Sequence, residues 1–463
     1  MKLKHSTLLV PEQNPFEFDK LERWPHAETL TQFIMSIEEP LTMSVESGWG
    51  HGKTTFFRMW GQHLKNNKFT CIPFNAWEGD YSDDPFIPFV TELRKAINEV
   101  KDDSGKVSKK LSDISDLLRK TGIQVAKRTI PVAAKILTAG LLDTEELIEQ
   151  AAGDAIGKAI EQKFDEYEAD RESLDQFKRA LTSTALELKA AGKQLPLVFM
   201  IDELDRCRPT FALALLERIK HLFNVEGIVF VLAIDHGQLC ESIRTVYGSK
   251  TDVNRYLRRF IDYRYALPDP KPEKYPEHLI SSMDYRNQFA RVTGDANAGN
   301  HFLETFTALS ACFGMRLRDQ EHAFSILAVV WRTLQDREDI NPFILASLLV
   351  LKVADENMYR QLVKGEIRVR EIVTHALKHP AGKKFLDENY GIAFEAYMWL
   401  GTETSDAINE MMNDLKKRAE RPDVYPDAEQ RLRVMQHCLQ FNSGRRSFDK
   451  VVNRLEIISP FKK

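Results

Sequence analysis

The sequence lacks any apolar run long enough to form a membrane-spanning helix. Such a helix needs about 20 consecutive apolar residues, whereas the nearest candidate, residues 129–142, is too short and contains Lys135. The first residues, MKLKHSTLLVPEQ, also lack the apolar core of a signal peptide. We therefore expect a cytoplasmic protein without an integral membrane segment.

Cysteine is scarce, and its few copies are scattered. The five cysteines are odd in number and never form a C-x-x-C pair, which argues against a disulfide framework and against a zinc ribbon. They fit the reducing environment of the cytosol. The positions are Cys71, Cys207, Cys240, Cys312 and Cys438.

Histidine offers one further pattern that could bind a metal. His375 and His379 have the i, i+4 spacing that could place two imidazoles on one helix face. The sequence supplies no third ligand nearby. We therefore interpret them as exposed helix histidines.

The chain has no large excess of charge of one sign. It contains 64 Lys and Arg against 68 Asp and Glu, a formal net charge of -4, which argues against a surface that generally coats nucleic acid. Residues 441–463 are locally basic, with six Lys and Arg against two Asp and Glu. This tail is either a solvated basic surface or a contact for nucleic acid or an acidic protein. Nucleic acid is thus a partner that the sequence permits but does not indicate.

Five apolar runs predict the strands of a buried sheet. Their nearly continuous Val, Ile, Phe and Leu content is typical of parallel strands covered on both faces, and the segments between them have helical spacing. This alternation predicts an α/β fold. The runs are residues 41–45, 69–74, 197–201, 228–234 and 260–267.

Composition divides the chain into four segments. About 100 residues between the second and third predicted strands exceed an ordinary crossover and indicate a helical insert, with an amphipathic helix over residues 148–164. This insert either packs on the sheet or serves a partner or a membrane surface. After the proline-rich residues 268–278 the pattern is helical almost to the end. We predict a first half of the core at 1–96, the insert at 97–194, the second half at 195–268, and a C-terminal helical lid and partner-binding domain at 269–463.

The stretch ESGWGHGKTT, residues 46–55, predicts a phosphate-binding loop. It follows an apolar strand and opens a helix, whose N-terminus favours an anion. We expect Lys53 to reach the outer phosphates and the Thr54 hydroxyl to bind Mg²⁺, as in a Walker A loop. Ser47 stands where the usual pattern has glycine, and it keeps a small side chain and a backbone N–H. The predicted nucleotide-binding residues of the loop are Ser47, Gly48, Trp49, Gly50, His51, Gly52, Lys53, Thr54 and Thr55.

Carboxylates follow two of the later apolar runs. In LVFMIDELDR, residues 197–206, the apolar strand ends in Asp202 and Glu203, about 150 residues after the glycine-rich loop. The first carboxylate can hold Mg²⁺ and the second can polarise an attacking water. Asp235 follows the next run. In P-loop proteins of the additional-strand type that strand lies between the other two, so we expect Asp235 near the γ-phosphate as a sensor, as a helix N-cap, or as both.

The sequence resembles the KAP family of P-loop NTPases. The resemblance covers residues 15 to about 268, and Ser47 and the absence of apparent transmembrane helices in the insert are departures from the family pattern. It is carried by W-G-x-G-K-T at residues 49–54, F-N-A-W at 74–77, I-D-E-L-D-R-C-R-P at 201–209, L-L-E-R-I-K-H-L-F at 215–223, V-F-V-L-A-I-D at 229–235 and R-Y-L-R-R-F-I at 255–261.

This resemblance implies an ATPase of the STAND/AAA-like branch. The implied fold is a P-loop NTPase core with five parallel strands, an insert between the Walker A and Walker B elements, and a C-terminal all-α domain. Asp202 is then the Mg²⁺ carboxylate and Glu203 the base, with Asp205 as a competitor for that role. The implied candidates for an arginine finger, from the same chain or from a neighbouring subunit, are Arg206, Arg255, Arg258 and Arg259.

Two further segments are similar to parts of such ATPases. FGMRLRDQEHAF, residues 313–324, resembles a sensor-2 helix and makes Arg316 and Arg318 candidates for contact with the γ-phosphate; the alternative is a solvated helix start. Residues 15–30 resemble the segment that lines the adenine pocket. No N-K-x-D motif for guanine is present, so ATP is the expected nucleotide.

Three functions follow from these patterns. The first is an ATP-hydrolysing switch or assembly ATPase that acts as a homo-oligomer, on a separate effector protein, or both; family resemblance extends this to bacterial antiviral defence. The second is a scaffold that holds ATP with little turnover. The third is an ATPase stimulated by nucleic acid, which would show a salt-sensitive response to DNA or RNA.

Overall fold

A computed structural model describes residues 9–82, 84–100, 109–129, 153–269, 274–334, 338, 340–440 and 444–457. The chain divides into two compact units, Leu9–Asp269 and a second that contains Pro270–Lys463. The division falls inside the proline-rich residues 268–278. Each unit is described here by itself.

The first unit is built on a five-stranded parallel sheet. The strand order is β2-β3-β4-β1-β5, and every neighbouring pair is parallel. Strand β4 therefore lies between β1 and β3, as predicted. The α/β fold with five parallel strands is confirmed. The five strands are β1 (Leu41–Glu46), β2 (Phe69–Asn75), β3 (Gln194–Asp202), β4 (Ile228–Ile234) and β5 (Tyr263–Ala266).

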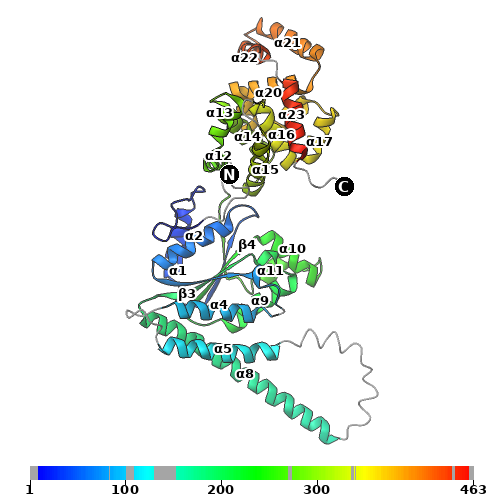
Figure 1. Cartoon of the computed structure of the whole chain (residues 1–463). Helices are drawn as coiled ribbons and strands as arrows, with labels where there is room; N and C mark the ends of the chain where they lie inside the picture. The colour runs from blue at the N-terminus through cyan, green and yellow to red at the C-terminus, as the bar shows by residue number, and fades with distance from the viewer. Residues whose placement is uncertain are drawn as a thin grey trace. The chain divides into compact units, whose positions relative to one another are not determined.

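Helices cover both faces of this sheet, which explains the continuous apolar runs. On one face Met43, Val45 and Val231 pack with side chains of α1 (Trp24–Met35) and α2 (Lys53–Asn66). Phe199 and Phe230 point to the other face and stack with ring centroids 4.9 Å apart. Figure 1 shows α1 and α2 on one side of the sheet and α4 (Phe86–Glu99) and α9 (Pro209–Leu222) on the other.

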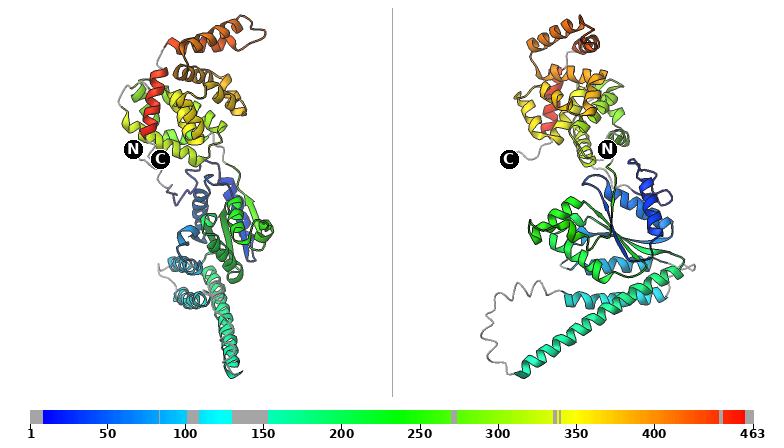
Figure 2. Two further views of the ribbon diagram at one scale, coloured as in Figure 1. Left: turned by 90° about the vertical axis from the view of Figure 1, so that its right-hand side faces the viewer. Right: turned by 180° about the vertical axis from the view of Figure 1, so that it is seen from behind.

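The described part of the insert packs on the first unit. Leu118 of α5 (Lys109–Thr129) and Phe177 and Leu181 of α8 (Gly153–Ala190) belong to the same buried cluster as strand residues such as Phe199. Helix α5 lies against both α4 and α8, one layer further from the sheet (Figure 2). Of the two alternatives predicted for the insert, its described residues show the first, packing on the sheet domain. The predicted amphipathic helix at 148–164 begins outside the described residues, and helix is described from Gly153.

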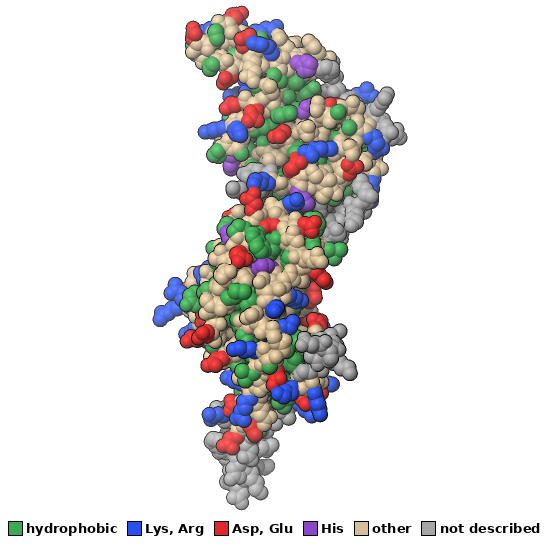
Figure 3. Space-filling view, turned by 90° about the vertical axis from the view of Figure 1, so that its left-hand side faces the viewer, with side chains coloured by type: hydrophobic (Ala, Val, Ile, Leu, Met, Phe, Trp, Pro, Cys, Tyr) green, Lys and Arg blue, Asp and Glu red, His purple; other side chains and the backbone are tan. Residues whose placement is uncertain are grey.

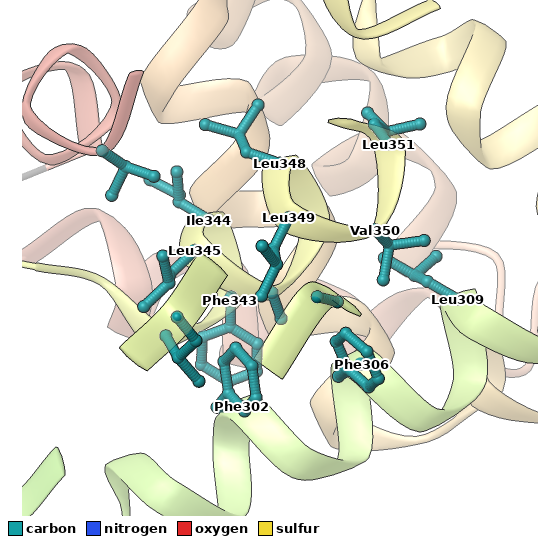
Figure 4. Close-up of a cluster of buried hydrophobic side chains, with 14 of the residues drawn as sticks. Phe302, Phe306, Leu309, Phe343, Ile344, Leu345, Leu348, Leu349, Val350 and Leu351 are labelled. Atoms are coloured by element: carbon teal, nitrogen blue, oxygen red, sulfur yellow. The ribbon is translucent and has the colours of Figure 1, made fainter. Parts of the chain in front are cut away.

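The second unit is helical throughout its described residues. Its core is formed around α16 (Pro342–Ala354), where ten consecutive residues from Pro342 to Leu351 are buried. Figure 4 shows side chains of α16 meeting Phe302, Phe306 and Leu309 of α14. A helix that is apolar on all sides must be surrounded, and here its neighbours are other helices.

The remaining bounds complete the description of the elements. In the first unit these are α3 (Ala76–Gly79), α4 (Phe86–Glu99), α5 (Lys109–Thr129), α8 (Gly153–Ala190), the 3₁₀ turn η1 (Leu204–Arg206), α9 (Pro209–Leu222), α10 (His236–Tyr247) and α11 (Val253–Leu257). In the second unit they are α12 (Tyr275–Ser282), α13 (Tyr285–Thr293), α14 (Ala298–Cys312), α15 (Leu317–Thr333), α17 (Glu356–Lys364), α18 (Val369–Ala376), α19 (Pro380–Asp387), α20 (Asn389–Thr402), α21 (Ser405–Ala419), α22 (Ala428–Gln440) and α23 (Gly444–Ile457).

Three general properties bear on the sequence expectations. Among the described residues, no helix has the length and apolar content needed to span a bilayer. Acidic and basic side chains are interspersed on the face drawn in Figure 3. All five cysteines are buried and none forms a disulfide.

Candidate active site

The loop between β1 and α2 has the backbone needed to surround an anion. Gly50 and Gly52 have φ angles of 79° and 81°, in the left-handed region that glycine enters without steric cost. Gly52 caps α2, and no side chain satisfies the N–H groups at the start of that helix. A Cβ at Gly48 would lie 3.1 Å from the His51 ring, a tight contact that would require the ring to shift. The loop therefore presents a helix N-terminus that is free to bind an anion.

Lys53 lies within this loop and is surrounded by acids. Its Nζ donates hydrogen bonds to the carbonyl oxygens of Ser47 and Gly48, at 2.5 Å and 3.4 Å. Burial lowers the pKa of Lys53, and the carboxylates of Asp205, Asp235 and Asp202 act against that shift in decreasing order. The loop thus carries one buried ammonium close to three carboxylates from two other strands.

Thr54 and Asp202 meet across the sheet edge. Asp202 Oδ1 accepts the Glu203 N–H at 2.8 Å, and the Thr54 hydroxyl is close enough to the Asp202 carboxylate to lower its pKa. Burial nevertheless raises the pKa of Asp202 above its ordinary value. A cation beside this carboxylate would relieve the cost of its burial.

The pair fits Mg²⁺ rather than a metal held by protein alone. Among the described residues no group of three His, Cys, Asp or Glu could hold a metal ion. Mg²⁺ commonly takes one or two carboxylates and completes its shell with water and substrate phosphates. Thr54 and Asp202 supply such a partial set of oxygens.

Glu203 stands at a sharp turn directly after β3. Its φ and ψ of 61° and 25° are left-handed, which is uncommon for any residue other than glycine. The carboxylate is held from two sides: Arg206 Nη1 lies 3.0 Å from Oε1, and Asn75 Nδ2 donates to Oε2 at 3.2 Å. The side chain is only 14% exposed. The turn and these two contacts together fix where the Glu203 carboxylate points.

Asn75 is the functional candidate that sequence reasoning missed. It ends β2 directly beside Asp202 in the sheet register, and its Oδ1 accepts the N–H groups of Trp77 and Glu78 to cap α3. Its amide nitrogen is thereby oriented toward Glu203. The available signal was a polar residue at the carboxyl end of a strand that neighbours the acidic strand.

Asp205 and Asp235 are both tied to the loop through Trp49. The Trp49 indole N–H donates to Asp205 Oδ2, and the Trp49 backbone N–H donates to Asp235 Oδ2 at 3.1 Å. Asp235 Oδ1 also accepts the Gln238 N–H at 3.2 Å, so its predicted role as an N-cap is confirmed. Its role as a phosphate sensor stays a prediction.

An ion pair between Glu46 and Arg264 lies at the end of β1, next to the loop. Glu46 at the end of β1 accepts hydrogen bonds from Arg264 Nε and Nη2, at 2.7 Å and 2.6 Å, and from Ser44 Oγ at 2.7 Å. Burial opposes the charge of Glu46, yet the hydrogen bonds from Arg264 and Ser44 outweigh it and lower the pKa of this carboxyl. The pair joins β1 to the edge strand β5 just before the loop begins.

The other predicted residues fall in the loop itself, beside Glu203, on and after α11, and in the second unit. His51 contacts Asp269 through Nδ1 at 2.9 Å, and Thr55 lies in the first turn of α2. Arg206 is the finger candidate that contacts Glu203. Arg255, Arg258 and Arg259 are exposed on and just after α11. Arg316 and Arg318 lie at the start of α15 in the second unit, and their contact with phosphate stays a prediction.

The two spaced histidines do not share a helix face. His375 lies in α18, stacked on Phe313 at 4.3 Å, whereas His379 caps the next helix, α19. Both are partly buried, so the interpretation as exposed helix histidines was wrong. The proline at position 380 starts a new helix, so the two histidines lie in different elements, although their rings are neighbours with centroids 5.5 Å apart.

Comparisons with known proteins complete the picture. The KAP family P-loop domain matches residues 23–291. No curated protein matches the chain significantly. Among solved structures, PCH-2 of C. elegans is 13% identical with a TM-score of 0.31, over 75% of this chain and 69% of that chain. The ORC2 protein of Aeropyrum pernix is 12% identical with a TM-score of 0.32, over 94% of each chain. Neither structural likeness is strong enough to support an argument about function.

Proposed function

Since the chain belongs to the KAP family of P-loop domains, we propose that it binds ATP together with Mg²⁺ and hydrolyses the terminal phosphate. The observation that carries this proposal is the closeness of the Thr54 hydroxyl of the loop to the Asp202 carboxylate of β3, which acts to lower the pKa of that carboxyl. Two segments far apart in the sequence thereby supply a hydroxyl and a carboxylate to one place, as phosphoryl transfer on a P-loop needs.

Each of the clustered residues has a distinct role in this proposal. The N–H groups at the start of α2 and the Lys53 ammonium hold the phosphates, and Thr54 and Asp202 hold Mg²⁺. When bound, the cation neutralises charge on the phosphates. Glu203 orients the attacking water and accepts its proton.

The geometry favours Glu203 over Asp205 as the base. Asp205 is 7% exposed, and its Oδ2 already accepts the Trp49 indole N–H. Glu203 instead follows β3 directly, and Asn75 and Arg206 hold its carboxylate. Arg206 could add positive charge at the transition state once released from Glu203.

Phosphate release by the purified protein tests the proposal. Glu203→Gln should lower the rate by about 10² to 10⁴, while ATP binding with Mg²⁺ persists. Lys53→Ala should weaken binding itself. Equal background rates for the wild-type and Glu203→Gln proteins, with ATP still bound, would favour the alternative of a nucleotide-holding scaffold.

Turnover of this kind suits a molecular switch. We propose that ATP and Mg²⁺ order the loop, that hydrolysis releases it, and that the change is passed to a second copy of the chain or to an effector protein. Family resemblance extends this to bacterial antiviral defence. The extension predicts that Glu203→Gln abolishes any protection from phage that the intact gene confers on its host.

A further inference from the structure

Trp49 connects the phosphate loop to two strands at once. Its backbone N–H donates to Asp235, which follows β4, and its indole N–H donates to Asp205, which follows β3. The residue is 37% exposed, so burial of the ring alone does not account for a tryptophan here. The indole hydrogen bond is a specific contact that a tryptophan contributes here.

Asp205 lies close to Lys53. It is buried and accepts the Trp49 indole N–H, and Trp49 follows Gly48, whose carbonyl oxygen accepts a hydrogen bond from Lys53 Nζ. Among the carboxylates that oppose the lowering of the Lys53 pKa, Asp205 has the largest effect. A buried carboxylate requires a hydrogen-bond donor or a cation. Trp49 supplies the donor, and Lys53 is a cation close by.

A bound triphosphate and the Asp205 carboxylate would compete for the Lys53 ammonium. Lys53 can serve the outer phosphates fully only if Asp205 does not capture it as an ion-pair partner. The indole hydrogen bond satisfies one oxygen of Asp205 and fixes its orientation. This bond therefore bears directly on how readily Lys53 can reach a phosphate.

We propose that Trp49 is a positioning residue for ATP binding, whose indole N–H restrains Asp205 and thereby keeps Lys53 available to the phosphates. The inference rests on the proposed function and deepens it. It gives the tryptophan of the loop a role that is separate from the wrapping of phosphate by backbone N–H groups.

Calorimetric titration of ATP with Mg²⁺ tests this inference, with every variant made in a Glu203→Gln background to prevent turnover. Trp49→Phe keeps an aromatic ring but removes the donor, and should weaken binding about tenfold. Adding Asp205→Asn removes the competing charge, and should restore affinity to within about threefold of the parent. Asp205→Asn alone should bind at least as tightly as the parent.

The matched control is Trp399→Phe in α20, which makes the same change outside the phosphate loop and the segment compared with an adenine pocket, and should leave affinity unchanged. Unchanged affinity in Trp49→Phe would overturn the inference. So would a double variant that binds no better than Trp49→Phe, since the indole would then act only through the shape of the loop. If Asp205→Asn alone binds tenfold more weakly, the carboxylate aids binding and the inference is also wrong.

Failure of the proposed function looks different from failure of this inference. In that case the Glu203→Gln parent itself binds no ATP, although it is folded. The inference would then fail with it. A parent that binds ATP isolates the contribution of Trp49.

Discussion

At the scale of single residues, Asn75 links the end of one strand to the proposed base on the next. One end of its amide caps α3 and the other contacts Glu203. The same side chain therefore contributes to stability and to the direction of a carboxylate. These two contributions can be separated by substitution.

Asn75→Ala should lose both contributions. We expect the free energy of unfolding to fall by about 1 kcal/mol through loss of the cap, and kcat to fall about tenfold because Glu203 loses a hydrogen bond. Asn75→Ser keeps a capping oxygen but is too short to reach Glu203, so it should lose activity alone. Urea denaturation and steady-state kinetics measure the two effects; equal kcat in the Ser variant and the wild type would contradict the proposed contact.

The left-handed backbone of Glu203 gives a second prediction at this scale. Glycine adopts φ near 61° without strain, whereas alanine does not. Glu203→Gly should therefore be more stable than Glu203→Ala by about 1 kcal/mol, the reverse of their order in a helix. Both variants should be inactive. Thermal denaturation of the two variants measures their relative stability. A more stable alanine variant would contradict the prediction and show that the backbone of this turn leaves the left-handed region.

At the scale of elements, the edge strand β5 depends on its tie to β1. Its four residues are mostly exposed, and Glu46 binds Arg264 in a bidentate pair across the two strands. The pKa of Glu46 is lowered on folding, so its carboxylate stabilises the fold above the unfolded pKa. That stabilisation is lost as the pH falls through the folded pKa.

Glu46→Gln should accordingly cost stability at neutral pH only. We expect a loss of about 1 kcal/mol at pH 7, because Arg264 is half-exposed and water weakens the pair. The difference should shrink as the pH falls below the ordinary glutamate pKa of about 4.3. Urea unfolding at several pH values measures it. A difference that is constant down to acidic pH would assign the effect to packing.

Strands were easier to predict from the sequence than contacts. Strands β1, β3 and β4 can each be predicted from their own residues, because burial on both faces requires apolar residues along the whole strand. The hydrogen bonds of Asn75 and Trp49 carry no such signal. They join residues separated by 128 and 156 positions, and only the sheet order brings them together. The edge strand β5 is also shorter than its apolar run, since Phe260 and Ile261 are buried in the turn before it.

At the scale of the whole molecule, two units with separate cores share one chain. The core around the sheet and the core around α16 are distinct clusters. Each unit should therefore unfold in its own transition. The predicted phosphate loop lies wholly within Leu9–Asp269.

Saturating ATP with Mg²⁺ should raise the unfolding transition of the first unit. Ligand at about 100 times its Kd adds about 2.7 kcal/mol to the stability of the state that binds it. Scanning calorimetry with the Glu203→Gln protein follows both transitions without turnover, and Lys53→Ala is the control in which the shift should vanish. A shift that survives Lys53→Ala would place the nucleotide elsewhere.

The five buried cysteines, none of them in a disulfide, can report local opening of the structure through their reactivity. Burial raises the pKa of Cys71 and of Cys207 to about 12, so neither reacts with an alkylating reagent until its surroundings open. Cys207 follows the turn that holds Glu203, and its Sγ lies 3.5 Å from the Glu203 carbonyl oxygen. Cys312 and Cys438 report on the other unit in the same way. The labelling rate of each cysteine, resolved by mass spectrometry, would measure the opening of the turn after β3 and of the helical unit independently, without adding a foreign probe.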